Sequence, residues 1–125
     1  MDIVKEVKEE FEKIFSTNPL LVFSPGRINI IGEHTDYNGG FVFPAAVDKG
    51  IAAALQKSDT GSCTAIALNL DSTINFELDK LKPSKEGSWE NYVLGVVAEI
   101  QNRNKIVGDF NIIFKGNIPG GAGMS

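Results

Sequence analysis

The sequence predicts one α+β domain, in which several strands form a sheet and two helices pack against it. Its 125 residues are enough for a single hydrophobic core, and its hydrophobic and charged contents, 42% and 22%, are those of a globular chain. Two segments carry apolar residues at helical spacing, and several short apolar runs indicate strands. We therefore expect a mixed or antiparallel sheet covered by helices on one face.

The first expected element is a helix over residues 2–15, because its apolar residues form one stripe and Lys and Glu fill the opposite face. Asn18-Pro19 ends this helix. Two short apolar runs, 20–23 and 28–31, then indicate strands, the second being either separate or a continuation of the first. We expect Ser24-Pro25-Gly26 to force a turn between them.

The rest of the chain alternates loops with further regular elements. Residues 33–40 are polar and glycine-containing, so they indicate a loop, and Asn38-Gly39 is typical of a hairpin turn that leads into a returning strand at 41–43. Ser88 is a natural N-cap for a second helix, in which Trp89 is expected to anchor the apolar stripe to the core. The remaining expected strands are 50–56, 64–68, 74–78 and 110–114.

Charge and composition exclude several classes of protein. The chain has 12 Lys and Arg against 16 Asp and Glu, a net charge of −4, which argues against general nucleic-acid binding. Its apolar runs are far shorter than the roughly 20 residues of a membrane helix, and its densely charged N-terminus is not a secretory signal. The single Cys63 cannot form an internal disulfide, and we interpret it as a small buried hydrophobic residue. We expect a cytoplasmic protein.

Residues 24–40, SPGRINIIGEHTDYNGG, concentrate hydrogen-bonding side chains between two apolar runs. Glu33, His34 and Asp36 suit a sugar, since carboxylates accept bonds from hydroxyl pairs and a histidine can donate or accept. Arg27 beside them could hold a phosphate or a developing negative charge. The same residue types also suit a solvated loop, so composition and spacing leave both interpretations open.

The stretch GRINIIGEHTDYNGG resembles the signature of the galactokinase family, within the larger group of kinases that phosphorylate homoserine, mevalonate and phosphomevalonate. Trp89-x-Asn91-Tyr92-Val93-x-Gly95-Val96 resembles the family's helix after the first sheet. Ile118-Pro119-x-Gly121-Ala122-Gly123-Met124-Ser125 resembles the start of its phosphate loop, with Met where Leu is commoner. The resemblance covers essentially the whole chain. It implies one incomplete domain over residues 1–125, the N-terminal lobe of the galactokinase-type fold, with substrate-binding and partial nucleotide-binding roles.

The resemblance also implies a role for each matched residue. Glu33, His34, Thr35 and Asp36 would bind the hydroxyls of the sugar, and Arg27 would stabilise the transition state near the attacking C1 hydroxyl. The nucleotide phosphates would be bound by Gly121, Ala122, Gly123, Met124 and Ser125. These roles suit phosphoryl transfer, which depends mainly on positioning and electrostatic stabilisation. Glycines also let backbone amides approach phosphate oxygens closely, although this segment lacks the Gly-Lys-Ser/Thr ending of a Walker A loop.

Galactokinases are several times longer than this chain, so the resemblance implies a truncated N-terminal fragment. The catalytic aspartate and the Mg²⁺ ligands would lie beyond Ser125, and no metal site is expected within the chain. We expect the fragment to be inactive alone. If a following helix normally covers one face of the sheet, its absence exposes apolar surface, and we expect the fragment to dimerise, swap elements or be only marginally stable.

The function that the resemblance implies for the parent protein is transfer of phosphate from ATP, with Mg²⁺, to α-D-galactose. A related sugar 1-kinase acting on N-acetylgalactosamine or galacturonate is an alternative, although Thr35-Asp36-Tyr37-Asn38-Gly39 looks more like the galactose enzymes. A non-catalytic sensor of galactose and ATP is a second alternative. The fragment itself could also be a folding unit without activity. None of these requires a nucleic-acid or membrane partner.

Overall fold

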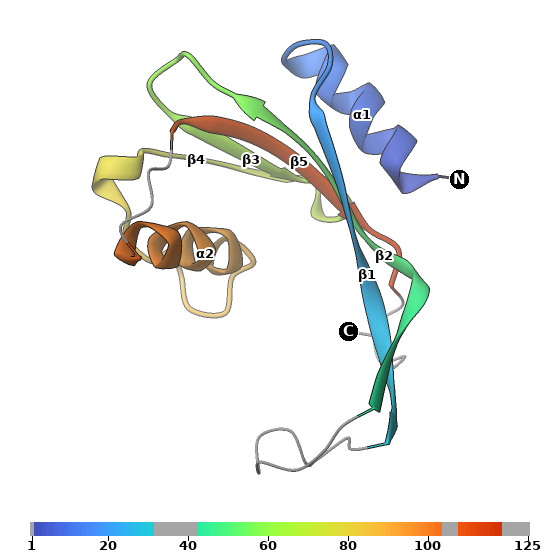
Figure 1. Cartoon of the computed structure of the whole chain (residues 1–125). Coiled ribbons are helices and arrows are strands. Elements are labelled where there is room, and N and C mark those ends of the chain that lie inside the picture. The colour runs from blue at the N-terminus through green and yellow to red at the C-terminus, as the bar shows by residue number, and fades with distance from the viewer. Residues whose placement is uncertain (1, 32–42, 104–107, 119–125) are drawn as a thin grey trace.

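The computed structural model describes residues 2–31, 43–103 and 108–118. One strongly curved sheet runs through the molecule, with a helix near each of its faces (Figure 1). The α+β class is therefore confirmed. The elements follow in the order α1 (Ile3–Ile14), β1 (Leu20–Ile31), β2 (Phe43–Lys57), β3 (Cys63–Ala67), the 3₁₀ turn η1 (Leu68–Leu70), β4 (Ser72–Phe76), the 3₁₀ turn η2 (Leu78–Lys80), α2 (Glu90–Asn102) and β5 (Phe110–Gly116).

The strands form a five-stranded mixed sheet in the order β1-β2-β5-β3-β4. Neighbouring strands are antiparallel except β3 and β5, which run parallel. The last described strand in the sequence therefore lies in the middle of the sheet, between β2 and β3. The residues that follow β5 consequently leave the sheet beside β2, at the position where Ile51 pairs with Gly116.

β1 is a single strand, so the expected turn at Ser24-Pro25-Gly26 does not form and residues 28–31 continue the first run. The pairing with β2 instead shifts register between Pro25 and Arg27. A proline is tolerated here because β1 is an edge strand, where one side of the backbone needs no partner. The extra residues at this shift belong to β2, in which residues 47–49 lie opposite Gly26, and β1 continues through it.

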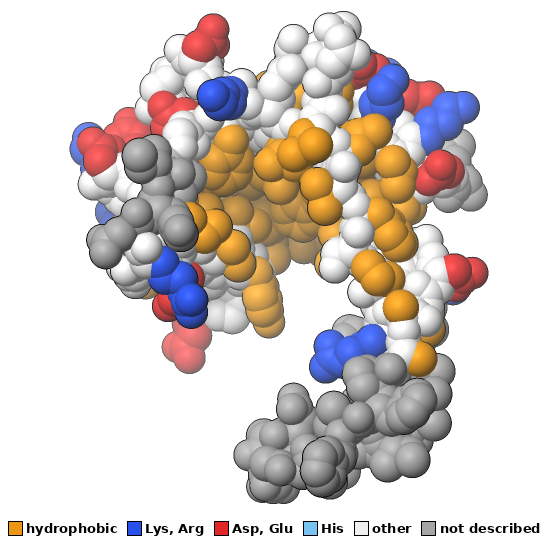
Figure 2. All heavy atoms as spheres, in the orientation of Figure 1, with side chains coloured by type: hydrophobic (Ala, Val, Ile, Leu, Met, Phe, Trp, Pro, Cys, Tyr) orange, Lys and Arg blue, Asp and Glu red, His pale blue; other side chains and the backbone are white. Residues whose placement is uncertain are grey.

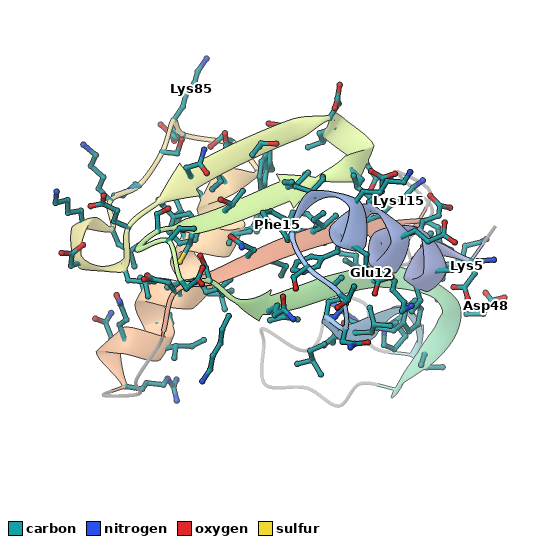
Figure 3. The ribbon with its side chains drawn as sticks, turned by 90° about the horizontal axis from the view of Figure 1, so that it is seen from above. Lys5, Glu12, Phe15, Asp48, Lys85 and Lys115 are labelled. Carbon is teal, nitrogen blue, oxygen red and sulfur yellow. The ribbon has the colours of Figure 1, made fainter. Side chains whose placement is uncertain are left out.

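α1 covers one face of the sheet. Its apolar stripe packs on small residues of β2 and on β5, and the helix is capped by Asp2, whose Oδ1 accepts a hydrogen bond from Val4 N at 2.9 Å. Figure 3 shows the helix lying over the strands, and Lys115 of β5 pairs with Glu6 at the margin of this contact. The buried cluster consists of Ile3, Val7, Phe11, Ala52, Ala54 and Ile113.

α2 lies on the opposite face, so the two helices do not share one face as the sequence analysis expected. Consecutive strand residues point to opposite faces, and Ile113 joins the α1 cluster while Phe114 contacts Trp89, with ring centroids 5.7 Å apart. Trp89 thus anchors the start of α2, as expected. Ser88 is not the N-cap, because Trp89 occupies that position without a side-chain cap. The backbone of Ser88 accepts from Asn91 N and donates to Lys85 O.

The face that carries α2 remains largely open. Figure 2 shows apolar side chains lining a hollow between the sheet and α2. By the register of the sheet, Leu20 and Val22 of β1 lie on this face, and both are exposed. Tyr92 and Val96 of α2 are exposed as well.

Within the described ranges, no helix is both long enough and apolar enough to cross a membrane.

Candidate functional site

Only one of the side chains that the sequence analysis assigned to the site lies within the described residues. Arg27 is exposed on β1, with its backbone opposite Ala46 of β2. Glu33, His34, Thr35 and Asp36 lie outside the described residues, as do Gly121, Ala122, Gly123, Met124 and Ser125. The strands that flank both segments, β1, β2 and β5, are described. Their pairing and contacts define the surroundings of the candidate site.

The segment that contains Glu33 to Asp36 joins two strands that are paired at their ends. Ile31, the last residue of β1, pairs with Phe43, the first residue of β2. Arg27 lies on the same strand, so Arg27 and the segment extend from one β1–β2 ribbon. The paired strands β1 and β2 therefore support both Arg27 and the ends of this segment.

Next to Arg27, the two strands of this ribbon approach unusually closely at Gly50. A Cβ atom at this position would lie 2.2 Å from the carbonyl oxygen of Ser24 and 2.8 Å from the Cα of Pro25. Real Cβ atoms do not come this near to backbone atoms, so only glycine fits between the register shift of β1 and its partner. Gly50 therefore fixes the bend of β1 immediately before Arg27.

The backbone of Gly50 is also bound by the first residue after β5. Asn117 N donates to Gly50 O at 3.0 Å, and Gly50 N donates to Asn117 Oδ1 at 2.8 Å. A second asparagine holds the preceding residue from the other side. Gly116 N donates to Asn69 Oδ1 at 2.7 Å, and Asn69 Nδ2 donates to Gly116 O at 3.0 Å.

These contacts connect β1, two residues before Arg27, with the residue that follows β5. Pro25 pairs with Gly50, and Gly50 is bonded to Asn117, which leads into the glycine-rich segment. Adjacent strands lie about 4.8 Å apart, so the β1 backbone near Arg27 is roughly 10 Å from the end of β5.

The sequence analysis did not single out Gly50, Asn69 or Asn117. A signal was present for the asparagines, because Asn side chains often bond to nearby backbone groups where a strand or turn ends. The partners could not be identified, however, because Asn69 and Gly116 are brought together only by the insertion of β5 beside β3. The requirement for glycine at position 50 likewise depends on the path of β1.

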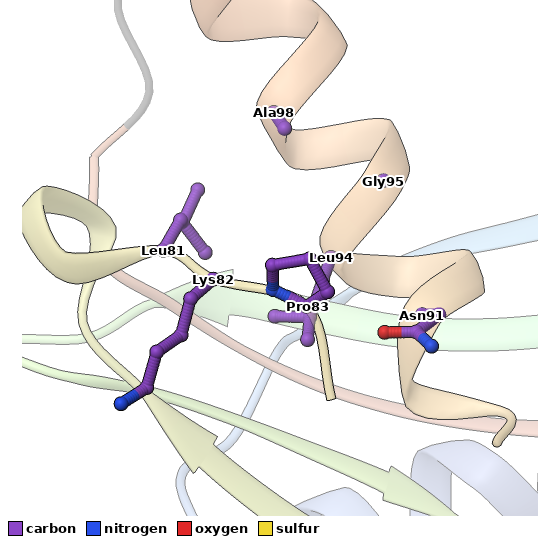
Figure 4. Close-up of a pocket in the computed structure, with 7 residues that line it drawn as sticks. All are labelled: Leu81, Lys82, Pro83, Asn91, Leu94, Gly95 and Ala98. Carbon is purple, nitrogen blue, oxygen red and sulfur yellow. The ribbon is translucent and has the colours of Figure 1, made fainter. Parts of the chain in front are cut away.

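A shallow groove of about 300 Å³ lies elsewhere, between α2 and the segment that follows η2 (Figure 4). Its walls are mostly apolar, and none of the predicted site residues lines it. Asn91, its amide-bearing residue, is engaged with the backbone of Ser84 and Lys85. The lining residues are Leu81, Lys82, Pro83, Asn91, Leu94, Gly95 and Ala98.

Cys63 is fully buried in β3, which confirms its interpretation as a small core residue. Burial raises the pKa of its thiol, and Phe110 N donates to its Sγ at 3.4 Å. A protonated buried thiol is a poor nucleophile, so this cysteine is not a candidate catalytic group. Across the described ranges, no three His, Cys, Asp or Glu residues gather as a set that could hold a metal ion.

Comparisons with known proteins identify relatives of this chain. The family model of the galactokinase galactose-binding signature matches residues 9–57, which include Arg27 and the segment between β1 and β2. The galactokinase of Fusobacterium nucleatum is 44% identical over 99% of this chain, and that of Clostridium acetobutylicum is 43% identical over the whole chain. The chain spans about a third of the length of these curated relatives, 32% and 33% respectively.

Solved structures give the same result. The crystal structure of Lactococcus lactis galactokinase complexed with galactose matches 99% of this chain and 33% of that one, with a TM-score of 0.86 and 33% sequence identity. The Methanococcus jannaschii mevalonate kinase matches 86% of this chain and 35% of its own, with a TM-score of 0.69 at 16% identity, and thus shares the fold. Sequence signature, curated relatives and fold together show that this chain belongs to the galactokinase family.

Proposed function

We propose that this chain is part of a galactokinase, which transfers the γ-phosphoryl group of ATP to the C1 hydroxyl of α-D-galactose. The hydroxyl oxygen forms a bond to the γ-phosphorus while the bond from that phosphorus to the bridging oxygen of ADP breaks. The hydroxyl proton passes to a base that we do not assign within this chain. The products are galactose 1-phosphate and ADP.

One observation supports this function most directly. The galactose-binding signature falls on the β1–β2 ribbon, and the register Pro25–Gly50 with the Gly50–Asn117 hydrogen bonds sets that ribbon beside the start of the glycine-rich segment. Phosphoryl transfer requires the attacking hydroxyl and the nucleotide to be held in line. In this proposal the sheet supplies that alignment, because it supports both the sugar segment and the phosphate segment.

In this proposal Glu33, His34, Thr35 and Asp36 hold the sugar hydroxyls. Carboxylates accept hydrogen bonds from pairs of hydroxyls, so the two acidic residues orient the ring and thereby present its C1 hydroxyl. Arg27 stabilises the negative charge that develops on the transferred group. Its exposure on β1 leaves the guanidinium accessible to a ligand.

The nucleotide phosphates are bound by Gly121, Ala122, Gly123, Met124 and Ser125. Small residues allow backbone N–H groups to reach phosphate oxygens, and the serine hydroxyl can donate to them. Mg²⁺ would neutralise phosphate charge, and we assign it no ligand in this chain.

We also propose that residues 1–125 form one lobe, which carries the sugar-binding residues and part of the nucleotide site. We further propose that the protein is cytoplasmic.

Galactose calorimetry with an Asp36→Ala variant tests the sugar site, using the natural polypeptide expressed from its complete coding sequence. Loss of a charge-assisted bond should weaken galactose binding by about tenfold or more. Asp59→Ala is the matched control, because Asp59 follows the far end of β2. Equal affinity in the unmodified protein and Asp36→Ala would refute the assigned role, and a panel of N-acetylgalactosamine and galacturonate would identify a different sugar preference.

We further propose that the chain, when expressed alone, self-associates through its open apolar face. On that face the sheet exposes Leu20, Val22 and Ile51, and the helix α2 beside it exposes Tyr92 and Val96. Apolar surface of this kind favours association in water. Sedimentation equilibrium should show a concentration-dependent mass that Val22→Lys reduces, and a strictly monomeric unmodified chain would contradict the proposal.

A further inference from the structure

We propose that Asn69 and Asn117 are positioning residues, which fix where the glycine-rich segment leaves the sheet relative to Arg27. The inference rests on the proposed function, in which that segment binds the nucleotide phosphates. Both asparagines are exposed, and neither belongs to the buried cluster under α1. Together they make four hydrogen bonds to the backbone of residues around the end of β5.

Asn69 replaces a missing strand neighbour. The parallel pairing of β3 with β5 ends where Ala67 lies opposite Phe114, so β3 does not reach Gly116. The side-chain amide of Asn69 makes the hydrogen bonds that a strand neighbour would make, since it accepts from Gly116 N and donates to Gly116 O. A carboxamide has the donor and acceptor of a peptide group, so it can bond both backbone groups of one residue. The final residue of β5 is thereby held on the β3 side.

Asn117, the residue after Gly116, is itself held on the β2 side. Its backbone N–H donates to Gly50 O while its side-chain oxygen accepts from Gly50 N. Gly50 in turn pairs with Pro25 of β1, at a contact too close to admit a Cβ atom. The position of Asn117 is therefore coupled, through a single residue, to the strand that carries Arg27.

The two asparagines thus hold consecutive residues from opposite sides just before Ile118 and Pro119. In a reaction that depends on alignment, displacing one reacting group by about 1 Å can reduce the rate by about 100-fold. Loosening this support should misplace the phosphate segment while leaving the galactose-binding residues between β1 and β2 unaffected. The expected signature is a defect in the use of ATP without a defect in galactose affinity.

Steady-state kinetics on the natural polypeptide, expressed from its complete coding sequence, test this inference. We expect Asn69→Ala and Asn117→Ala each to raise the KM for ATP by about tenfold and to lower kcat, with the KM for galactose within about twofold. Asn75→Ala is the matched control. Asn75 is also an exposed sheet asparagine, and its side chain accepts a hydrogen bond from Thr64 Oγ1 at 2.8 Å on the distant β3–β4 pair.

A pair of aspartate variants separates positioning from a general effect of substitution. Asn117 uses its side chain only as an acceptor in these contacts, so Asn117→Asp keeps the bond from Gly50 N. Asn69 both accepts and donates, so Asn69→Asp faces the Gly116 carbonyl with a second oxygen. Both variants add one negative charge. The larger rise in the KM for ATP should therefore occur in Asn69→Asp.

The outcomes distinguish failure of the positioning role from failure of the proposed function. If the unmodified protein phosphorylates galactose and both alanine variants keep its KM for ATP, the inference is overturned and the proposed function stands. A parallel rise of both KM values, or loss of folded structure by circular dichroism, also overturns it by indicating a merely structural role. If the unmodified protein phosphorylates no sugar, the proposed function fails and the inference falls with it.

Discussion

The two faces of the sheet are covered to very different degrees by helices of similar length. Under α1, Val7 and Phe11 have no exposed surface, whereas on α2 Tyr92 is 80% exposed and Val96 61%. Both helices carry an apolar stripe at helical spacing. Such a stripe shows that a helix has an apolar side, but it does not show that the rest of the described chain covers that side.

The sheet itself explains the difference. On the α1 face β2 presents Ala52 and Ala54, whose small side chains leave room for the ring of Phe11. On the α2 face β5 presents larger side chains, and α2 touches the sheet at its start, where Trp89 meets Phe114. At the other end of α2, Gln101 Nε2 donates to Leu78 O at 3.1 Å. α1 is therefore part of the core through three buried residues, whereas α2 buries one, Val97.

The largest effect should come from emptying the α1 core. Phe11→Ala removes a fully buried ring and should destabilise the chain by about 3–5 kcal/mol, whereas Tyr92→Ala on the open face should change stability by less than about 0.5 kcal/mol. Urea unfolding followed by circular dichroism measures both. Similar losses for the two variants would show that α2 is packed in solution, and the contrast between the faces would be wrong.

Two glycines test the same contrast through the backbone. Gly50→Ala places a Cβ against Ser24 O and should destabilise the chain by about 1–3 kcal/mol, because β1 must shift. At Gly95 in α2, a Cβ atom would have no neighbour within 4 Å, so Gly95→Ala should stabilise the helix by up to about 1 kcal/mol. Thermal unfolding of the two variants should move in opposite directions. A stable Gly50→Ala chain would mean that the β1 register is adjustable.

The attachment of α2 should depend measurably on one hydrogen bond. Trp89 Nε1 donates to Ser72 Oγ at 3.1 Å, so Trp89→Phe removes the donor while keeping a ring against Phe114. We expect a loss of about 0.5–1.5 kcal/mol. Ser72→Ala removes the other partner, and the double variant should lose less than the sum of the two single variants. Strict additivity would show that this bond does not hold α2 in place.

Much of this architecture could be predicted from local patterns. Both helices and the strands β3, β4 and β5 were expected close to their observed positions, because hydrophobic periodicity is a local property. β2 was expected as two strands, at 41–43 and 50–56, but it is one strand, Phe43–Lys57. The expected turn at Ser24-Pro25-Gly26 was wrong, because proline is tolerated within an edge strand and the sequence does not show which strands are edges.

The placement of α2 and the support of the site depend on topology in the same way. Phe110, Ile112 and Phe114 alternate, which favoured one covered face, but the neighbouring Ile113 is also buried and joins the α1 cluster. An unbroken apolar run was the available signal for a strand covered on both faces. Arg27 was predicted from its motif, whereas the contacts of Asn69 and Gly50 arise only because β5 lies between β3 and β2.

The smallest expected effect lies at the end of α1 and sharpens the account of how that helix is held. Asn18 N donates to Glu12 Oε2 at 3.1 Å, and this bond, with a smaller contribution from Lys8, lowers the pKa of the Glu12 carboxyl. Because the pKa is lower in the folded than in the unfolded chain, the stabilisation is present above the unfolded value of about 4.3 and is lost as the pH falls through the folded value.

The stability advantage of the unmodified chain over Glu12→Gln should therefore shrink between pH 6 and pH 3, since the glutamine still accepts the bond but cannot titrate. Urea midpoints across this range measure the effect. Glu9→Gln controls for the loss of one exposed negative charge on the same helix, because Glu9 contacts only Lys5 among the described salt bridges. An advantage that stayed constant with pH would show that the carboxylate charge plays no part in holding Asn18, and that α1 depends on its buried stripe alone.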